Sequence, residues 1–222
     1  TRGTGKTTAS KVLARAINCL NPKDGDPCGE CEVCRALKAE NCMDVVEIDA
    51  ASNNGVDEIR DLREKIKYPP TLTKYKVYII DEVHMLSTGA FNALLKTLEE
   101  PPAHAVFILA TTEPQKLPAT ILSRCQRFDF HRISVDTMVA RMKVVLSGVG
   151  RTAEDEALRE IGRAAEGAMR DALSLLDGCL SYTDGEVTLQ LARDVLGTAG
   201  RGFLFDFAEK LIAFDIAGAL SD

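Results

Sequence analysis

The chain has 222 residues, of which 45% are apolar and 27% charged, and its 27 basic and 33 acidic side chains give a net charge of −6. This composition is that of a globular protein and excludes a wholly disordered chain, and no apolar run reaches the ~18 residues of a membrane-spanning helix. The negative charge also argues against a protein that coats nucleic acid by bulk positive charge.

The first eight residues form most of a phosphate-binding loop. The segment reads TRGTGKTT and matches G-x-x-x-x-G-K-[ST] at every position but the first. Gly3 and Gly5 let backbone N–H groups curl around phosphates, while Lys6 reaches the β- and γ-phosphates. Thr7 offers a hydroxyl to Mg²⁺, and apolar side chains at helical spacing over residues 7–20 predict a helix after the loop. Because such a loop follows a central strand of a parallel sheet, we expect the protein to continue upstream of this chain.

Four cysteines follow this helix, in the order Cys19-x8-Cys28-x2-Cys31-x2-Cys34. Thiolates suit tetrahedral Zn²⁺, and four of them leave no open coordination position, so the spacing predicts a structural zinc site. A redox Cys-x2-Cys pair is the alternative, but it would leave the other two cysteines unexplained. On spacing alone, Cys42 could replace Cys19 as the fourth ligand. The odd total of seven cysteines argues against a disulfide framework and predicts a reducing compartment.

After the cysteines, short apolar strands alternate with helices. The strands are rich in Val and Ile without polar alternation, which predicts an α/β fold with a buried parallel sheet. We expect strands at residues 44–49, 76–82, 105–110 and 126–130, and helices at 56–68 and 87–100, the second capped by Ser87.

Two carboxylates end the strand at residues 76–82. Asp81 is placed to hold Mg²⁺, directly or through water, and Glu82 is placed to polarise an attacking water. Two acids at the end of a strand can also be a solvated turn. Together with the phosphate loop, however, they predict ATP hydrolysis.

The second part of the chain is expected to contain helices only, which predicts a domain boundary near Ser134. The N-caps of its helices are predicted at Ser134, Thr152 and Thr188. A glycine-rich break at residues 196–202 then leads into a last helical stretch, 203–222, which we interpret as the beginning of a further domain.

Taken together, these segments closely resemble one family, the γ/τ subunits of the bacterial DNA polymerase III clamp loader, which are AAA+ P-loop ATPases. The segments that carry the resemblance are RGTGKTT at residues 2–8, the four cysteines, DEVHML at 81–86, FNALLKTLEEPP at 91–102 and SRC at 123–125. The resemblance implies an AAA+ domain over residues 1–134 that lacks its first strand in this chain, with a zinc module at 19–42. It also implies an all-α lid domain over 135–198 and the start of a helical collar domain over 199–222.

The resemblance further implies roles for single residues. Thr112, or Thr111, would sense the γ-phosphate through its hydroxyl. Arg124 would act in trans as an arginine finger on the ATP of the neighbouring subunit, and Arg170 would contact the phosphates from the lid. The expected catalytic residues are then Glu82, Asp81, Lys6 and Arg124. The expected nucleotide-binding residues are Gly3, Thr4, Gly5, Lys6, Thr7, Thr8, Thr112 and Arg170. The expected metal ligands are Thr7 and Asp81 for magnesium and, with Cys19 favoured over Cys42, Cys19, Cys28, Cys31 and Cys34 for zinc.

The function implied by the resemblance is that of an ATP-hydrolysing motor, located in the bacterial cytoplasm, that opens a sliding clamp and loads it on primed DNA. Its cofactors would be ATP, Mg²⁺ and structural Zn²⁺, and its partners the other subunits of a hetero-pentamer, the clamp and primer-template DNA, with no membrane. An inactive scaffold subunit is the alternative, although the intact residues of the phosphate loop and the two acids argue against it. A zinc-dependent nucleic-acid-binding module is disfavoured, because residues 19–43 carry three basic and five acidic side chains and would repel phosphate.

Overall fold

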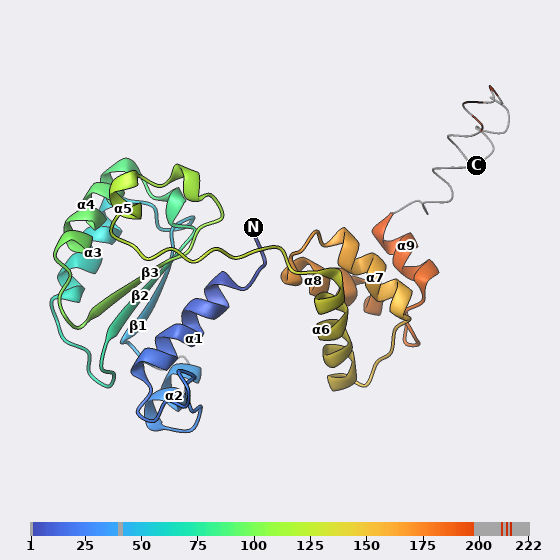
Figure 1. Cartoon of the computed structure of the whole chain (residues 1–222), viewed down its shortest axis with the longest axis horizontal. Coiled ribbons are helices and arrows are strands. Elements are labelled where there is room, and N and C mark those ends of the chain that lie inside the picture. The colour runs from blue at the N-terminus through green and yellow to red at the C-terminus, as the bar shows by residue number, and fades with distance from the viewer. Residues whose placement is uncertain (1, 40–41, 198–209, 211, 213, 215–222) are drawn as a thin grey trace. The chain divides into compact units, whose positions relative to one another are not determined.

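The structure, a computed structural model, describes residues 2–39, 42–197, 210, 212 and 214. The chain divides into two compact units, residues 5–130 and residues 1–4 together with 131–222 (Figure 1). This division falls after residue 130, whereas the sequence suggested a boundary after residue 134. The predicted collar segment, residues 199–222, lies outside the described residues except for three single positions. Within the described part of the chain, no helix is both long and apolar enough to cross a membrane.

The first unit is a three-stranded parallel sheet with helices on both faces. The strands lie in the order β1-β2-β3, and Asp49 at the end of β1 is the register partner of Asp81 at the end of β2. The strands are β1 (Val45–Asp49), β2 (Lys76–Asp81) and β3 (Ala105–Leu109). The helices are α1 (Lys6–Asn18), α2 (Glu32–Lys38), α3 (Val56–Ile66), α4 (Thr88–Glu99) and α5 (Ala119–Leu122), with short 3₁₀ turns η1 (Val83–Met85) and η2 (Pro114–Lys116).

The two faces of the sheet pack against different helices, because successive side chains of a strand point to opposite sides. Ile80 of β2 packs with Ile59 of α3 and Phe91 of α4. Ile79, one residue earlier, packs with Ala14 of α1. Figure 1 shows α3 and α4 on one side of the sheet and α1 on the other. The buried, apolar β2 is therefore covered on both faces, as its sequence predicted.

Two buried polar side chains fix the segments on either side of this core. Asp44 accepts hydrogen bonds from the backbone N–H groups of residues 71–73. Burial alone would raise the pKa of Asp44, but these donors hold it below its usual value. Asn18, the last residue of α1, donates to the carbonyl of Tyr75 and accepts from its N–H, at 3.0 and 2.7 Å. These contacts fasten the end of α1 to the residue that precedes β2.

The strand predicted at residues 126–130 is wrong, because this segment has no regular secondary structure. Its central side chain, Phe128, is 70% exposed. β3 pairs with β2 along one edge, and the described residues contribute no strand to its other edge. A strand exists only through hydrogen bonds to a neighbour, and this segment has no such neighbour among the described residues.

Over residues 131–197 the structure describes four helices around one apolar core. Ser134 and Thr188 cap their helices through their hydroxyls, as predicted. The predicted cap at Thr152 is wrong: its carbonyl accepts from the N–H of Val187, which keeps the chain extended up to the actual cap, Glu154. The helices are α6 (Val135–Gly148), α7 (Asp155–Ala164), α8 (Met169–Ser181) and α9 (Leu189–Leu196). Their core is formed by Met138, Met142, Leu146, Leu158, Ile161 and Leu176 among others.

Candidate functional site

The loop before α1 has the backbone of an anion-binding turn. Gly3 and Gly5 adopt φ values of +69° and +92°, a region that side chains other than hydrogen disfavour. Gly5 is the N-cap of α1, and its carbonyl accepts the N–H of Ala9 at 2.8 Å. Gly5 has no side chain that could cap this helix, and the N–H groups at the start of a helix favour an anion. The two glycines are therefore required by the conformation of the loop.

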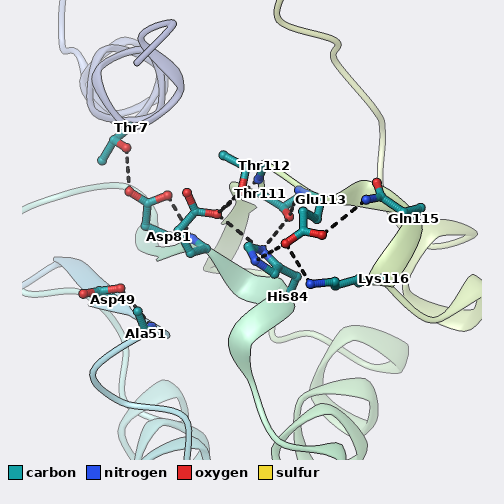
Figure 2. A network of polar contacts seen from close by, with 11 residues as sticks. Thr7, Asp49, Ala51, Asp81, His84, Thr111, Thr112, Glu113, Gln115 and Lys116 are labelled. Atoms are coloured by element: carbon teal, nitrogen blue, oxygen red, sulfur yellow. Dashed lines mark hydrogen bonds and ion pairs between the residues drawn. The ribbon is translucent and has the colours of Figure 1, made fainter. Parts of the chain in front are cut away.

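The predicted magnesium ligands lie side by side at the end of β2. Thr7, in the first turn of α1, donates from Oγ1 to Oδ2 of Asp81 at 2.6 Å (Figure 2). A hydroxyl and a carboxylate are hard oxygen donors of the kind that Mg²⁺ takes in phosphate sites. The donor set therefore fits the predicted ion, and Lys6, as the first residue of α1, belongs to the same helix turn.

Glu82 follows β2 in a left-handed backbone conformation, with φ of +45°. This conformation is uncommon for a residue with a side chain and is often found at functional sites. Its N–H donates to Oδ1 of Asp81 at 2.9 Å. Its Oε2 accepts two hydrogen bonds from Thr112, one from the N–H at 3.1 Å and one from the hydroxyl at 2.8 Å. The structure thus joins the predicted base to the predicted γ-phosphate sensor.

Thr111, the alternative candidate for the sensor, faces a different group. Its Oγ1 lies 2.9 Å from Nδ1 of His84 and accepts the N–H of Glu113 at 2.9 Å. Of the two adjacent threonines, only Thr112 contacts Glu82. This difference supports Thr112 as the sensor residue.

Arg124 lies just beyond α5, with its guanidinium at the surface. Nη2 binds Glu99 at the end of α4 at 3.0 Å, and Nη1 donates to the carbonyl of Thr120 at 2.8 Å. The side chain is 35% exposed. An exposed ion pair of this kind is weak, so the guanidinium can exchange Glu99 for an anion of another molecule.

Arg170 lies in the helical unit at the start of α8. In that unit the N–H of Met169 donates to the carbonyl of Gly3 at 2.9 Å. A Cβ on Gly3 would lie 2.9 Å from Cβ of Ala168 and 3.4 Å from Cβ of Arg170. The close approach is a second reason for glycine at position 3, and it places Arg170 beside the first part of the phosphate loop.

The four predicted zinc ligands converge. The sulfur atoms of Cys19, Cys28, Cys31 and Cys34 all lie within 4.8 Å of one another. Tetrahedral ligation at a Zn–S distance of about 2.3 Å separates sulfurs by about 3.8 Å, and Sγ of Cys28 lies 4.0 Å from Sγ of Cys34. Cys42 is not part of the cluster. The arrangement is compatible with zinc and favours Cys19 over Cys42.

Backbone N–H groups point at three of these sulfurs. Cys28 donates to Cys19, Cys31 to Cys28 and Cys34 to Cys31, at 3.3, 3.3 and 3.4 Å. Backbone donors at Leu20 and Cys34 lower the pKa of the Cys31 thiol to about 6, whereas burial raises the pKa of the Cys34 thiol to about 12. A metal ion that binds all four sulfurs must therefore displace a proton from Cys34.

We expect one zinc ion per chain in protein purified under reducing conditions, because four convergent thiolates form a closed tetrahedral site. Metal analysis by mass spectrometry measures the ratio directly. Cys34→Ser should lower it well below one and decrease thermal stability, since structural zinc contributes folding free energy. The matched control is Cys42→Ser, which should keep the metal; loss of zinc in this variant, or no zinc in the parent protein, would contradict the four-thiolate site.

One residue that the sequence reasoning did not single out is His84. It lies in η1 between Glu82 and the segment after β3, and its ring contacts residues from both. The sequence offered one signal for this residue: a histidine lies two residues after the predicted base, in an otherwise apolar stretch. The histidine ring carries a nitrogen on each of two sides, so the side chain can join two polar groups.

The fold is that of AAA+ P-loop ATPases. Among solved structures, the chain is similar to the RuvB Holliday junction branch migration motor of Thermotoga maritima, with a TM-score of 0.61 and 16% identity. The match covers 88% of this chain and 58% of that one. At this identity the likeness concerns the fold alone.

Two family models divide the chain between them. The one described as "DNA polymerase III, delta subunit" matches residues 1–134, and "DNA polymerase III clamp loader subunit, ATPase lid domain" matches residues 137–185. The chain belongs to the DNA polymerase III clamp-loader subunit family. It is 52% identical to DNA polymerase III subunit tau of Bacillus subtilis and 48% identical to that of Escherichia coli. The matches cover 99% and 96% of this chain but 39% and 33% of those proteins, so the chain spans well under half the length of these relatives.

Proposed function

We propose that this chain is the ATP-hydrolysing core of a γ/τ-type motor subunit, which uses ATP to open a sliding clamp and load it on primed DNA. One observation carries the proposal: the Thr7 hydroxyl meets the Asp81 carboxylate at 2.6 Å, with Glu82 next in the chain. A phosphate loop, a magnesium ligand pair and a base in this order are the parts that phosphoryl transfer to water requires. The similarity to relatives named DNA polymerase III subunit tau supports the assignment to a clamp loader.

In this proposal each residue has a defined role. Lys6 and the N–H groups at the start of α1 would bind the phosphates, while Thr7 and Asp81 would hold Mg²⁺, which when bound would supply positive charge at the phosphates. Glu82 polarises the attacking water, and Thr112 senses the γ-phosphate. The remaining proposed nucleotide contacts are Gly3, Thr4, Gly5, Thr8 and Arg170.

The proposed setting is a hetero-pentamer of clamp-loader subunits in the bacterial cytoplasm, acting on the clamp and on primer-template DNA. The proposed domains are an AAA+ domain over residues 1–134, a lid over 135–198 and a collar that begins at 199. The net charge of −6 is compatible with DNA contact inside a ring, since helix N-termini and a few basic side chains can bind phosphates. Structural Zn²⁺ at the four cysteines would stabilise the loop between α1 and α2.

Clamp loading by the full-length subunit, assembled with its partners, tests this function. Lys6→Ala should abolish ATP-dependent loading of the clamp on primed DNA, because the lysine compensates phosphate charge. Lys11→Ala is the matched control on the same helix: Lys11 forms an exposed ion pair with Glu47 at 2.7 Å, and its loss should leave loading unchanged.

The same assay separates the motor from an inactive scaffold subunit. A scaffold assembles and supports loading regardless of Lys6, so normal loading by Lys6→Ala would overturn the motor assignment. Gel filtration of the complex shows whether Lys6→Ala still assembles with its partners. If it does not assemble, the loss of loading cannot be attributed to ATP binding alone.

A further inference from the structure

His84 is a buried polar side chain to which the proposed ATPase mechanism gives no task. It lies in η1, two residues after Glu82, and only 6% of its side chain is exposed. Nδ1 is 2.9 Å from the Thr111 hydroxyl and 3.3 Å from Oε2 of Glu82, and Nε2 is 3.4 Å from Oε1 of Glu113 (Figure 2). Nδ1 thus faces both the predicted base and Thr111, while Nε2 faces Glu113.

The far side of this arrangement is itself held in place. Glu113 binds Lys116 at 2.8 Å, and the N–H of Glu113 donates to Oγ1 of Thr111 at 2.9 Å. The backbone N–H of Val83 donates to the carbonyl of Ala110 at 3.0 Å. Residues 110–116 therefore form a support against which the ring of His84 is fixed on both its nitrogens.

The hydrogen bonds that Glu82 accepts from Thr112 show why a second contact is needed to hold its carboxylate. Oε2 of Glu82 accepts both the N–H and the hydroxyl of Thr112. A hydroxyl carries one proton, so the Thr112 O–H can serve Glu82 or a γ-phosphate but not both at once. When Thr112 turns to the nucleotide, Nδ1 of His84 still lies 3.3 Å from this oxygen.

We propose that His84 is a positioning residue that keeps the Glu82 carboxylate in place when Thr112 engages the γ-phosphate. Its Nδ1 side holds Glu82 and Thr111, and its Nε2 side fixes the ring against Glu113. The inference rests on the proposed function, because it assumes that Glu82 polarises the attacking water. Misplacing a catalytic group by about 1 Å costs roughly 100-fold in rate, so the effect of losing such a residue is measurable.

Two substitutions separate the two sides of the ring. His84→Asn places an amide near the position of Nδ1 but does not reach Glu113, whereas His84→Gln places its amide near Nε2 and leaves Glu82 without the contact. The measurement is steady-state ATP hydrolysis by the complete loader with clamp and primed DNA, giving kcat and KM, together with the melting temperature of each variant. His104→Gln is the matched control, since Nε2 of His104 contacts the backbone carbonyl of Ile66 at 2.9 Å.

We expect His84→Gln to lower kcat by roughly 10- to 100-fold with little change in KM, and His84→Asn to retain most of the turnover. If His84 had a purely structural role, the loss of activity in each variant would follow the decrease in its melting temperature. Equal turnover of the Asn and Gln variants, or wild-type turnover of the Gln variant, would overturn the inference.

A double variant separates this inference from the proposed function. In the Glu82→Gln background, His84→Gln should cause no further loss, because both residues act through one carboxylate. If Glu82→Gln alone turns over ATP normally, the proposed role of Glu82 fails and the inference fails with it. If Glu82→Gln is inactive while His84→Gln is fully active, only the inference is overturned.

Discussion

Glu82→Gln in the full-length subunit should lower ATP turnover by roughly 10²- to 10⁴-fold, the range that a general base contributes, while ATP binding is retained. The amide keeps the size of the side chain and can still accept from the Thr112 hydroxyl, but it no longer attracts the proton of the attacking water. Single-turnover hydrolysis and nucleotide binding, both measured in the assembled complex, distinguish the two effects. Unchanged hydrolysis would refute the catalytic role.

Asp49→Asn is the matched control for this experiment. Asp49 ends the strand next to β2, in register with Asp81, and it accepts from the N–H of Ala51 and the hydroxyl of Ser52 within its own turn. A carboxylate at the same sheet edge is thereby removed without touching the proposed base. Loss of hydrolysis in this control would mean that removing any carboxylate from this edge of the sheet lowers activity. The result for Glu82→Gln would then not identify Glu82 as the base.

Arg124→Ala should impair hydrolysis at the ATP site of the neighbouring subunit by roughly 10³- to 10⁵-fold, the range for an arginine finger supplied in trans. The guanidinium is presented at the surface by the turn after α5, and its partner Glu99 is itself 51% exposed. Breaking that exposed ion pair so that the guanidinium can contact a transferring phosphate should therefore cost little free energy.

Complexes that contain one variant subunit at a known position test the direction of this effect. Loss confined to the variant's own ATP site would contradict action in trans. The control is Arg127→Ala, three residues away, whose guanidinium binds Asp129 at 2.8 Å and is 59% exposed. Removing this second surface arginine should leave hydrolysis at both sites unchanged.

Much of the fold was predictable because local patterns and tertiary packing agree. β2 reads as an unbroken apolar run, and Val77, Tyr78, Ile79 and Ile80 are all fully buried or nearly so. Ser87, Ser134 and Thr188 were predicted as caps, and each accepts a backbone N–H in the first turn of its helix. In these cases the local sequence and the environment favour the same structure.

The errors occurred where a distant partner decides the outcome. The segment at residues 126–130 forms no strand, because pairing depends on a neighbouring edge rather than on the segment itself. Thr152 is not a cap, because its carbonyl hydrogen-bonds to Val187 thirty-five residues later, which a local capping rule does not include. Long-range hydrogen bonds of this kind leave no local signal.

The sequence by itself determined the chemistry of this protein: the glycines and lysine of the phosphate loop, the acids Asp81 and Glu82 and the four cysteines were all visible as spaced motifs. Only the tertiary structure decided which donors meet which acceptors. It brought Cys19 and not Cys42 into the cysteine cluster, as the resemblance had implied, and it joined Glu82 to Thr112 and His84. The reason is physical: a motif fixes residue types within one segment, whereas a contact between the ends of adjacent parallel strands depends on the register of the whole sheet.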